Sequence, residues 1–477
     1  MSITCISILI STICTLTGLF YYYNIVYRNN VTATNYKFMQ YVIIAFFIGL
    51  LTCFCNIWLY LYFNPLLVDY SGVSLQYSYL FNMSLYYLPA DISVTPFILM
   101  LLICITSIYY CVQFTVDNLF RFFCYIGLII ISGYVFITTK LLLLFFISYE
   151  MLLIPTCIML FLFTKTTRGR TAVSAMILWT QAGALILFVI LYYSCNFQLL
   201  GQLDNIVYTN NRVFLNILIL CLFFCFGTKI PVWPFFWWLP EAHVEVSTHF
   251  SIVLSGVSIK FAFLGLWRFL NLYGGGDIYW VCVCICVYGL FSALFQIDIE
   301  VDLKKIVALL TVVEMHIFCI FLFIDASLFS DFITLALTTH CWLSSLQFIL
   351  VDIITRRYYS RNLEHLYGIV SGSPLIVKCI FIVVFIFGSI PGTNVFMIEV
   401  CMGLYSSLVF GGFVLVFCLQ FISVVWCKQT WWLLWGGDIQ NSTTHQFFNL
   451  TQHELYIIGA MLGLLLVPFS CMDLWLL

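Results

Sequence analysis

Long apolar segments alternate with short polar connections along the whole chain. Each apolar segment is close to the roughly 20 residues that an α-helix needs to cross a bilayer. Fourteen can be counted: 2–23, 38–63, 94–112, 120–138, 141–163, 173–193, 213–238, 247–269, 278–295, 306–323, 331–353, 375–407, 408–425 and 455–471. The pattern predicts an all-α polytopic membrane protein with about 14 transmembrane helices. Because no soluble domain interrupts the array, we expect residues 1–477 to form a single membrane domain.

The composition agrees with a membrane protein and excludes several other classes. Hydrophobic residues make up 64% of the 477 positions and charged residues 8%, with a mean hydropathy of +1.09, whereas soluble domains are about 25% charged. The net charge of -2, without any basic run, argues against nucleic acid as a partner. The 21 cysteines include no C-x-x-C pair and lie in apolar runs, so we interpret them as small apolar residues and expect no metal site.

Basic residues divide unequally between the two sides of the predicted array. Twelve lie near connections that follow odd-numbered segments, and three lie near the other connections. By the positive-inside tendency, the connections after odd-numbered segments face the matrix or cytoplasm, and both termini face the opposite side. The twelve are Arg28, Lys37, Arg121, Lys165, Arg168, Arg170, Lys304, Lys305, Arg356, Arg357, Arg361 and Lys428; the three are Lys140, Arg212 and Arg268.

Two predicted helices contain breaks at comparable places. Pro231 and Pro234 follow Lys229 in the seventh segment, and a Pro-Gly pair at 391–392 precedes Glu399 in the twelfth. Proline within a spanning helix frees backbone groups that need protein or water as partners. Breaks five helices apart predict two inverted repeats, residues 120–270 and 278–426, followed by a C-terminal connection and last helix at 427–477. The alternative is that the prolines only kink packed helices.

Ionisable side chains inside apolar segments are the candidate functional residues. Each costs about 2.5–3.5 kcal/mol at the bilayer centre, so such residues usually face a partner or a hydrated cavity. A carboxylate and a lysine that approach each other have coupled protonation and can form a proton switch. The alternatives are static salt bridges, a snorkelling Lys260 and an ordinary core histidine. The candidates are Glu150, Lys229, Lys260, Glu314, His340 and Glu399.

The motifs around these residues resemble a known family. Residues 227–269 begin GTKIPVWPFFWWLPEAHVEVS and continue into a helix that carries Lys260. This stretch resembles NADH dehydrogenase subunit 4, the antiporter-like membrane subunit of proton-pumping NADH:quinone oxidoreductase, in which K-x-P leads into W-L-P-x-A-H-V-E and a lysine-bearing helix. YEMLLIP around Glu150 is similar to the family's Y/F-E-x-x-L-I-P, and PGTNVFMIE resembles its P-G-x-x-x-F-x-x-E.

The resemblance implies a membrane-arm subunit of complex I in the mitochondrial inner membrane, beside the antiporter-like subunits 2 and 5. Such a subunit couples electron transfer to ubiquinone elsewhere in the complex to proton translocation. It has no redox active site and no cofactor, because flavin and iron–sulfur clusters lie elsewhere. The implied proton path enters by Glu150 and Lys229, passes Lys260 and the Glu314/His340 region, and leaves by Glu399. The alternatives are a subunit of a multisubunit cation/proton antiporter, which shares these motifs, and a static membrane scaffold.

Two positions depart from the family pattern. Glu314 stands where the family has histidine in S-V-S-H-M, and His316, about 200° further round the helix, is not expected to replace it. HVEVS replaces H-V-E-A-P, and we interpret the polar side chains of this stretch, Glu241, His243 and Glu245, as loop anchors. Lys304 and Lys305 are interpreted as topology charges, and Lys378 as a snorkelling side chain.

Overall fold

The computed structural model describes part of the chain: residues 75–76, 84–85, 119–139, 141–164, 166–194, 212–273, 278–324, 326–366, 369, 373–388, 393–396, 398 and 450–465. The predicted helices at 2–23, 38–63, 94–112 and 408–425 lie outside these residues, as does Glu399. Two short strands, β1 (Leu75–Gln76) and β2 (Ser84–Leu85), pair antiparallel in the connection between the predicted helices 38–63 and 94–112. The remaining described elements are helical.

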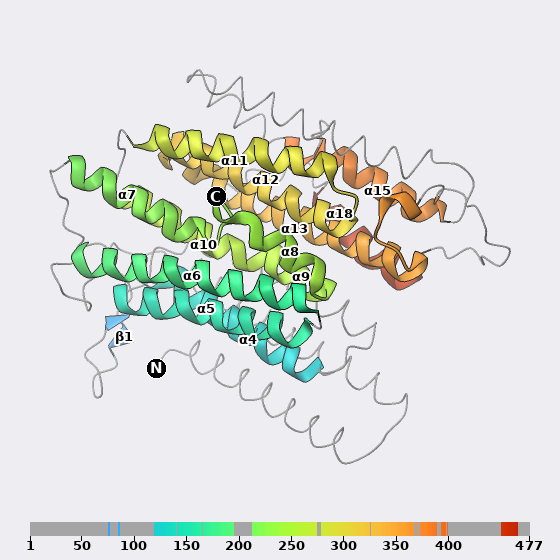
Figure 1. Ribbon diagram of the computed structural model, residues 1–477, viewed down its shortest axis with the longest axis horizontal. Coiled ribbons are helices and arrows are strands. Elements are labelled where there is room, and N and C mark those ends of the chain that lie inside the picture. Colours follow the sequence, from blue (N-terminus) through green and yellow to red (C-terminus); the bar gives the residue numbers. More distant parts are fainter. Residues whose placement is uncertain are drawn as a thin grey trace, which may run out of the picture.

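The helices form a bundle of roughly parallel and antiparallel rods (Figure 1). Their bounds are α4 (Leu119–Thr138), α5 (Leu142–Phe163), α6 (Thr167–Ser194), α7 (Arg212–Gly227), α8 (Trp238–Glu245), α9 (Thr248–Val253), α10 (Ile259–Tyr273), α11 (Tyr279–Ile299), α12 (Leu303–Ile324), α13 (Ala326–Tyr358), α15 (Pro374–Phe387) and α18 (Gln452–Leu465). Six helical spans among the described residues are long and apolar enough to cross a membrane. The prediction of a helical membrane protein is therefore confirmed, while the total of 14 helices stays a prediction.

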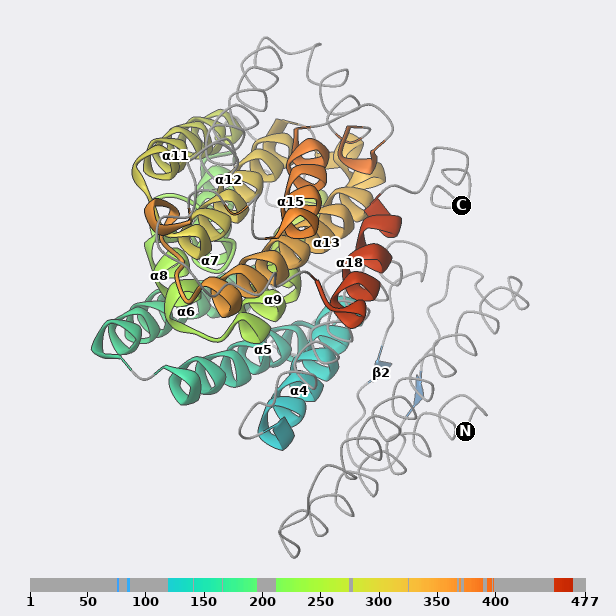
Figure 2. The same ribbon diagram turned by 90° about the vertical axis from the view of Figure 1, so that its right-hand side faces the viewer.

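The core of the described bundle lies along α12 and α13. Nearly all residues of α12, and of α13 over 336–354, are buried, whereas fewer than half of those in the apolar stretches of α6 and α11 are. Figure 2 shows α4, α5 and α6 on one side and α11, α12, α13 and α15 on the other. α10 contacts α4, α7 and α13 and so joins the two groups. Large apolar side chains such as Leu178 (71% exposed) and Phe295 (68%) cover the outer helices, as a bilayer-facing surface requires.

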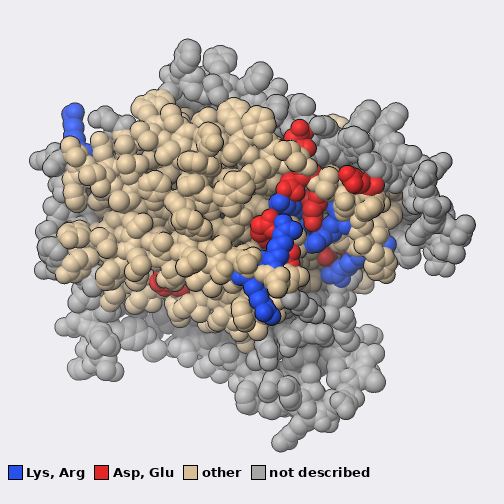
Figure 3. All heavy atoms as spheres, viewed as in Figure 1, with Lys and Arg blue, Asp and Glu red and all other residues tan. Residues whose placement is uncertain are grey.

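Charged side chains gather at one end of the described bundle (Figure 3). Glu241 accepts from Arg168 at 2.8 Å and lies 3.5 Å from Lys305. Arg168 and Lys305 were both predicted on the basic side, and their shared partner brings them to the same end. Arg268, predicted on the other side, donates instead to the carbonyl oxygens of the last residues of α4, including Phe136 at 3.1 Å. The position of Arg168 and Lys305 at one end of the bundle agrees with their predicted placement on one side of the membrane. Which side of the membrane that end faces stays a prediction.

The predicted break in the seventh span is present. α7 ends at Gly227, and after a non-helical stretch the chain resumes in a 3₁₀ turn (Phe235–Trp237) and α8. Pro231 and Pro234 lack a backbone N–H, so the α7 hydrogen-bond ladder cannot continue through them. In the twelfth span, α15 ends at Phe387 and helical residues recur at 394–396, while the Pro-Gly pair lies outside the described residues.

The eighth span has an interruption that the sequence pattern did not predict. It consists of α9, a π-helical turn (Leu254–Ser258) and α10. Such turns insert one extra residue into a helix and are frequent at functional sites. Here the wider turn lies directly before Lys260.

Candidate functional site

The stretch between α7 and α8 carries Lys229. Its ammonium donates a 2.8 Å hydrogen bond to the carbonyl oxygen of Tyr149 and lies 3.1 Å from the centroid of the Tyr149 ring. Tyr149 is itself buried, and its hydroxyl donates to the Cys225 carbonyl oxygen at 3.3 Å. The lysine is thus held by one carbonyl and one aromatic face.

Glu150 follows Tyr149 directly on α5. Its Oε2 accepts a 3.0 Å hydrogen bond from Nε2 of Gln181 on α6. Its Oε1 is buried and has no hydrogen-bond partner within the described part of the chain. Glu150 and Lys229 interact electrostatically, but no direct ion pair joins them in the described residues. The structure therefore places both predicted residues next to Tyr149, Lys229 through its contacts with the Tyr149 carbonyl and ring and Glu150 as the next residue along α5.

Lys260 is fully buried in the centre of the bundle. Its ammonium turns back along its own helix and donates to the carbonyl oxygen of Ser255, inside the π-helical turn. The adjacent Gly256 carbonyl accepts from Sγ of Cys341 on α13 at 2.5 Å. The widened turn thus exposes carbonyls that a regular helix would use internally. The alternative that Lys260 snorkels to the membrane surface is wrong.

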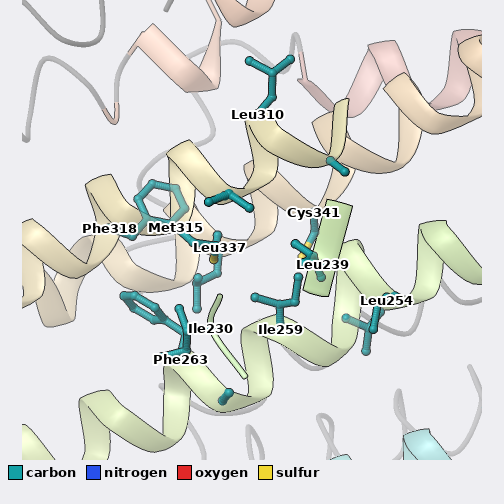
Figure 4. Close-up of a cluster of buried hydrophobic side chains, with 14 of the residues drawn as sticks. Ile230, Leu239, Leu254, Ile259, Phe263, Leu310, Met315, Phe318, Leu337 and Cys341 are labelled. Carbon is teal, nitrogen blue, oxygen red and sulfur yellow. The ribbon is translucent and has the colours of Figure 1, made fainter. Parts of the chain in front are cut away.

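The surroundings of Lys260 combine apolar packing with four ionisable groups, one of which is the thiol of Cys341. Figure 4 shows Ile259 and Phe263 of α10 facing Phe318 of α12 and Leu337 of α13. Within this cluster of buried hydrophobic residues, Lys260 interacts electrostatically with three acid or histidine side chains besides Cys341. These are Glu314 of α12, His340 of α13 and His243 of α8. Lys260 is therefore the point at which two further predicted residues, Glu314 and His340, converge.

His340 is buried and lies edge-on to Phe318, with ring centroids 5.9 Å apart. Its Nδ1 has no hydrogen-bond partner among the described residues. Because neutral imidazole carries one donor and one acceptor nitrogen, this ring nitrogen has hydrogen-bonding capacity that no described group uses.

Two functional candidates were missed or misread from the sequence. Lys304, interpreted as a topology charge, is only 3% exposed, and its ammonium donates to the Val246 carbonyl. His243, interpreted as a loop anchor, points inward, stacks on Phe348 with centroids 4.9 Å apart, and interacts electrostatically with both Lys304 and Lys260. The other anchors in that stretch do lie at the charged end of the bundle, since Glu241 pairs with Arg168.

The signal that separates Lys304 from Lys305 is absent from the sequence. Lys305 forms ion pairs with Glu241 and Glu300, as a topology charge would. α12 is apolar on every face, so its pattern does not show which of two consecutive lysines turns inward. Among the described residues, no cluster of three His, Cys, Asp or Glu side chains is arranged to hold a metal ion.

With the geometry described, comparison with known proteins assigns the family. The family model "NADH:quinone oxidoreductase/Mrp antiporter, TM" matches residues 139–425, more than half of the chain. The chain belongs to the NADH:quinone oxidoreductase/Mrp antiporter family. The match begins between α4 and α5 and includes every predicted site residue from Glu150 to Glu399. The predicted resemblance is thereby confirmed.

Individual proteins that are similar to this chain support the family assignment. The "NADH-ubiquinone oxidoreductase chain 4" of Paramecium tetraurelia is 29% identical over 374 residues, covering 74% of this chain and 77% of the relative. A chain of respiratory complex I from Thermus thermophilus superposes with a TM-score of 0.70 at 14% identity, covering 98% of both chains. A chain of the Mrp complex from a Dietzia species superposes with a TM-score of 0.73 at 16% identity, covering 94% of this chain and 83% of that one. The two structural similarities establish the antiporter-like fold only.

Proposed function

We propose that this chain is the proton-translocating membrane-arm subunit, of the subunit 4 type, of an NADH:ubiquinone oxidoreductase in the mitochondrial inner membrane. Electron transfer from NADH, with its flavin and iron–sulfur clusters, takes place elsewhere in the complex. This chain supplies a proton path and has no redox site of its own. Family membership and the Paramecium relative support this function, and antiporter-like subunits 2 and 5 are the proposed neighbours.

The observation that carries the proposal is the convergence of buried ionisable groups on Lys260. In a dry apolar core, a single unpaired charge costs about 2.5–3.5 kcal/mol. A set of such groups within electrostatic range of one another has coupled protonation, so a proton that arrives at one changes the affinity of the next. Glu314, His340 and His243 are related to Lys260 in this way.

The proposed path has two branches that meet the central groups. One runs from Glu150 past Tyr149 to Lys229. The other runs from the charged end, where Lys304 lies within electrostatic range of Asp352 and Glu245, to His243 and then Lys260. Glu399 is the proposed exit. The whole-chain plan of 14 helices, with inverted repeats at 120–270 and 278–426, is part of the proposal.

The test is Lys229→Ala in the assembled complex. We expect the rate of proton pumping coupled to NADH oxidation to fall at least about 100-fold, the lower end of what a positioned proton carrier contributes, while the complex still assembles. Lys378→Ala is the matched control because this lysine is exposed on α15, and it should pump normally. Normal pumping by Lys229→Ala would contradict the proposal.

A second candidate is a subunit of a multisubunit cation/proton antiporter, which the similarity to a chain of the Dietzia Mrp complex favours. A native gel of mild-detergent extracts separates the two functions. Comigration of the chain with NADH:dye reductase activity in a very large assembly supports complex I. Migration apart from that activity, with sodium-dependent proton flux in vesicles, supports the antiporter.

A further inference from the structure

The backbone N–H of Trp233 needs a partner from outside its own segment. Trp233 lies in the non-helical stretch between α7 and α8, where Pro231 and Pro234 have no N–H. The other amides of the stretch bond locally: Lys229 and Ile230 to Phe226, Val232 to Gly227 and Phe235 to Val232. Trp233 N donates instead to Nε2 of His316 on α12, at 3.0 Å. In a membrane interior, where water is scarce, a backbone amide has to find such a partner within the protein.

The His316 ring is fixed at both nitrogens. It is fully buried, and Nδ1 lies 2.7 Å from the carbonyl oxygen of Val312 in the preceding turn of α12. A carbonyl only accepts, so Nδ1 carries the ring proton and donates. Nε2 is then an acceptor, which is what the Trp233 amide requires. The imidazole therefore works here as a neutral adaptor between a carbonyl and an amide.

Gly289 on α11 makes room for this contact. A Cβ at position 289 would lie 2.2 Å from His316 Nε2 and 2.7 Å from Cβ of Trp233. Neither neighbour can yield easily, because the imidazole is held at both nitrogens and the Trp233 Cβ is attached directly to the backbone. Three elements, α11, α12 and the break, thus meet at one hydrogen bond that only glycine at 289 permits.

We propose that His316 is a positioning residue for Lys229. By accepting from Trp233, it fixes the stretch 228–234, and this stretch in turn places the Lys229 ammonium on the Tyr149 carbonyl. Glu314, two residues earlier on α12, interacts electrostatically with Lys260 instead. One helix therefore supports both lysine sites through side chains on different faces. The expected loss of proton transfer through Lys229 rests on the proposed function. The hydrogen bond between Trp233 and His316 does not depend on that function.

The experiment measures the Trp233 amide and pumping in the same purified complex. His316→Leu removes the acceptor at similar volume, His316→Gln keeps an acceptor oxygen, and Gly289→Ala displaces the ring without removing it. Met315→Leu, a buried neighbour on α12, is the matched control. Deuterium uptake is followed in a peptide that contains Trp233, and proton pumping per electron in reconstituted vesicles.

We expect roughly tenfold faster exchange of the Trp233 amide in His316→Leu and Gly289→Ala, the effect of losing one hydrogen bond, together with reduced pumping. His316→Gln and Met315→Leu should match the unmodified protein in both measurements. Unchanged exchange in His316→Leu and Gly289→Ala overturns the proposal, as does a Gln variant as impaired as the Leu variant. Faster exchange with full pumping overturns the positioning role. Normal pumping by Lys229→Ala would overturn the proposed function, whatever the exchange of the Trp233 amide shows.

Discussion

Lys260 illustrates how a buried cation is accommodated in this core. Its ammonium has a carbonyl partner from the π-helical turn, supplied by Ser255. A charged side chain at the centre of a membrane protein costs about 2.5–3.5 kcal/mol, a cost that an uncharged side chain of similar volume does not carry. The methylene stem of Lys260 already packs among apolar side chains, so methionine fits the same space. The charge of Lys260 is therefore better explained by function than by stability.

We therefore predict that Lys260→Met assembles normally, with a thermal midpoint of the complex equal to or above that of the unmodified complex, but loses proton pumping. The physical reason is that methionine keeps the volume and removes the proton carrier at the meeting point of Glu314, His340 and His243. Thermal inactivation and pumping per electron are measured together, with Lys378→Met as the exposed control. A variant that still pumps at full rate would show that Lys260 is not on the path.

Residues differ in how far the sequence reveals them. Lys229 and Lys260 stand out because each is a lone cation in an apolar run. His316 gave no such signal, because its role depends on an amide that α7 leaves unpaired 83 positions earlier in the chain. Lys304 was misread because long lysine side chains usually extend to the membrane surface, whereas here the side chain is buried and donates to the Val246 carbonyl, directly after α8. Long-range covering of this kind leaves no local pattern.

At the scale of elements, a close approach between α6 and the end of α7 supports the Lys229 site. A Cβ at Gly183 on α6 would lie 2.6 Å from Oγ1 of Thr228 and 2.7 Å from the Cys225 carbonyl oxygen. Thr228 immediately precedes Lys229, and Cys225 is the acceptor for the Tyr149 hydroxyl. The spacing of the two helices is thus set by the absence of a side chain at 183.

Gly183→Ala is accordingly predicted to lower the stability of the subunit by about 1–3 kcal/mol, the usual cost of overpacking, and to reduce pumping by displacing Lys229. Gly127→Ala on α4 is the control, since a Cβ there meets no described atom within 4 Å. Thermal inactivation of the assembled complex gives the stability difference. Equal midpoints for the two variants would mean that α6 and α7 tolerate a wider separation.

Helix positions were more predictable than helix interiors. Segment 120–138 corresponds to α4 (Leu119–Thr138) and 141–163 to α5 (Leu142–Phe163) because abrupt polar boundaries limit both. The break after Lys229 was predictable from its prolines. The π-helical turn was not, since residues 254–258, LSGVS, contain no helix breaker stronger than glycine. α13 extends to Tyr358, beyond the predicted 331–353, because its polar end pairs Arg356 with Asp352 at 2.6 Å.

At the scale of the whole molecule, the outer face of α5 and α6 is not uniformly apolar. Gln181 is exposed on α6, between the strongly exposed Leu178 and Leu185, and its amide holds the carboxylate of Glu150. An amide and a carboxylate facing lipid tails would be costly. The apolar residues around them fit a bilayer, but this polar pair fits a protein surface better. We infer that a neighbouring subunit covers this face in the assembly.

A photoreactive amino acid placed at residue 181 is therefore predicted to cross-link to a second polypeptide in the native complex. The same probe at Phe295, on the exposed apolar face of α11, serves as a comparison site without a polar partner. Mass spectrometry of the cross-linked product identifies the neighbour, for which another antiporter-like subunit is expected. Cross-links only to lipid at 181 would place the Glu150–Gln181 pair against the bilayer. In that case the entry of the proposed path at Glu150 would lie at the lipid-facing surface of this chain and not at a contact with a second subunit.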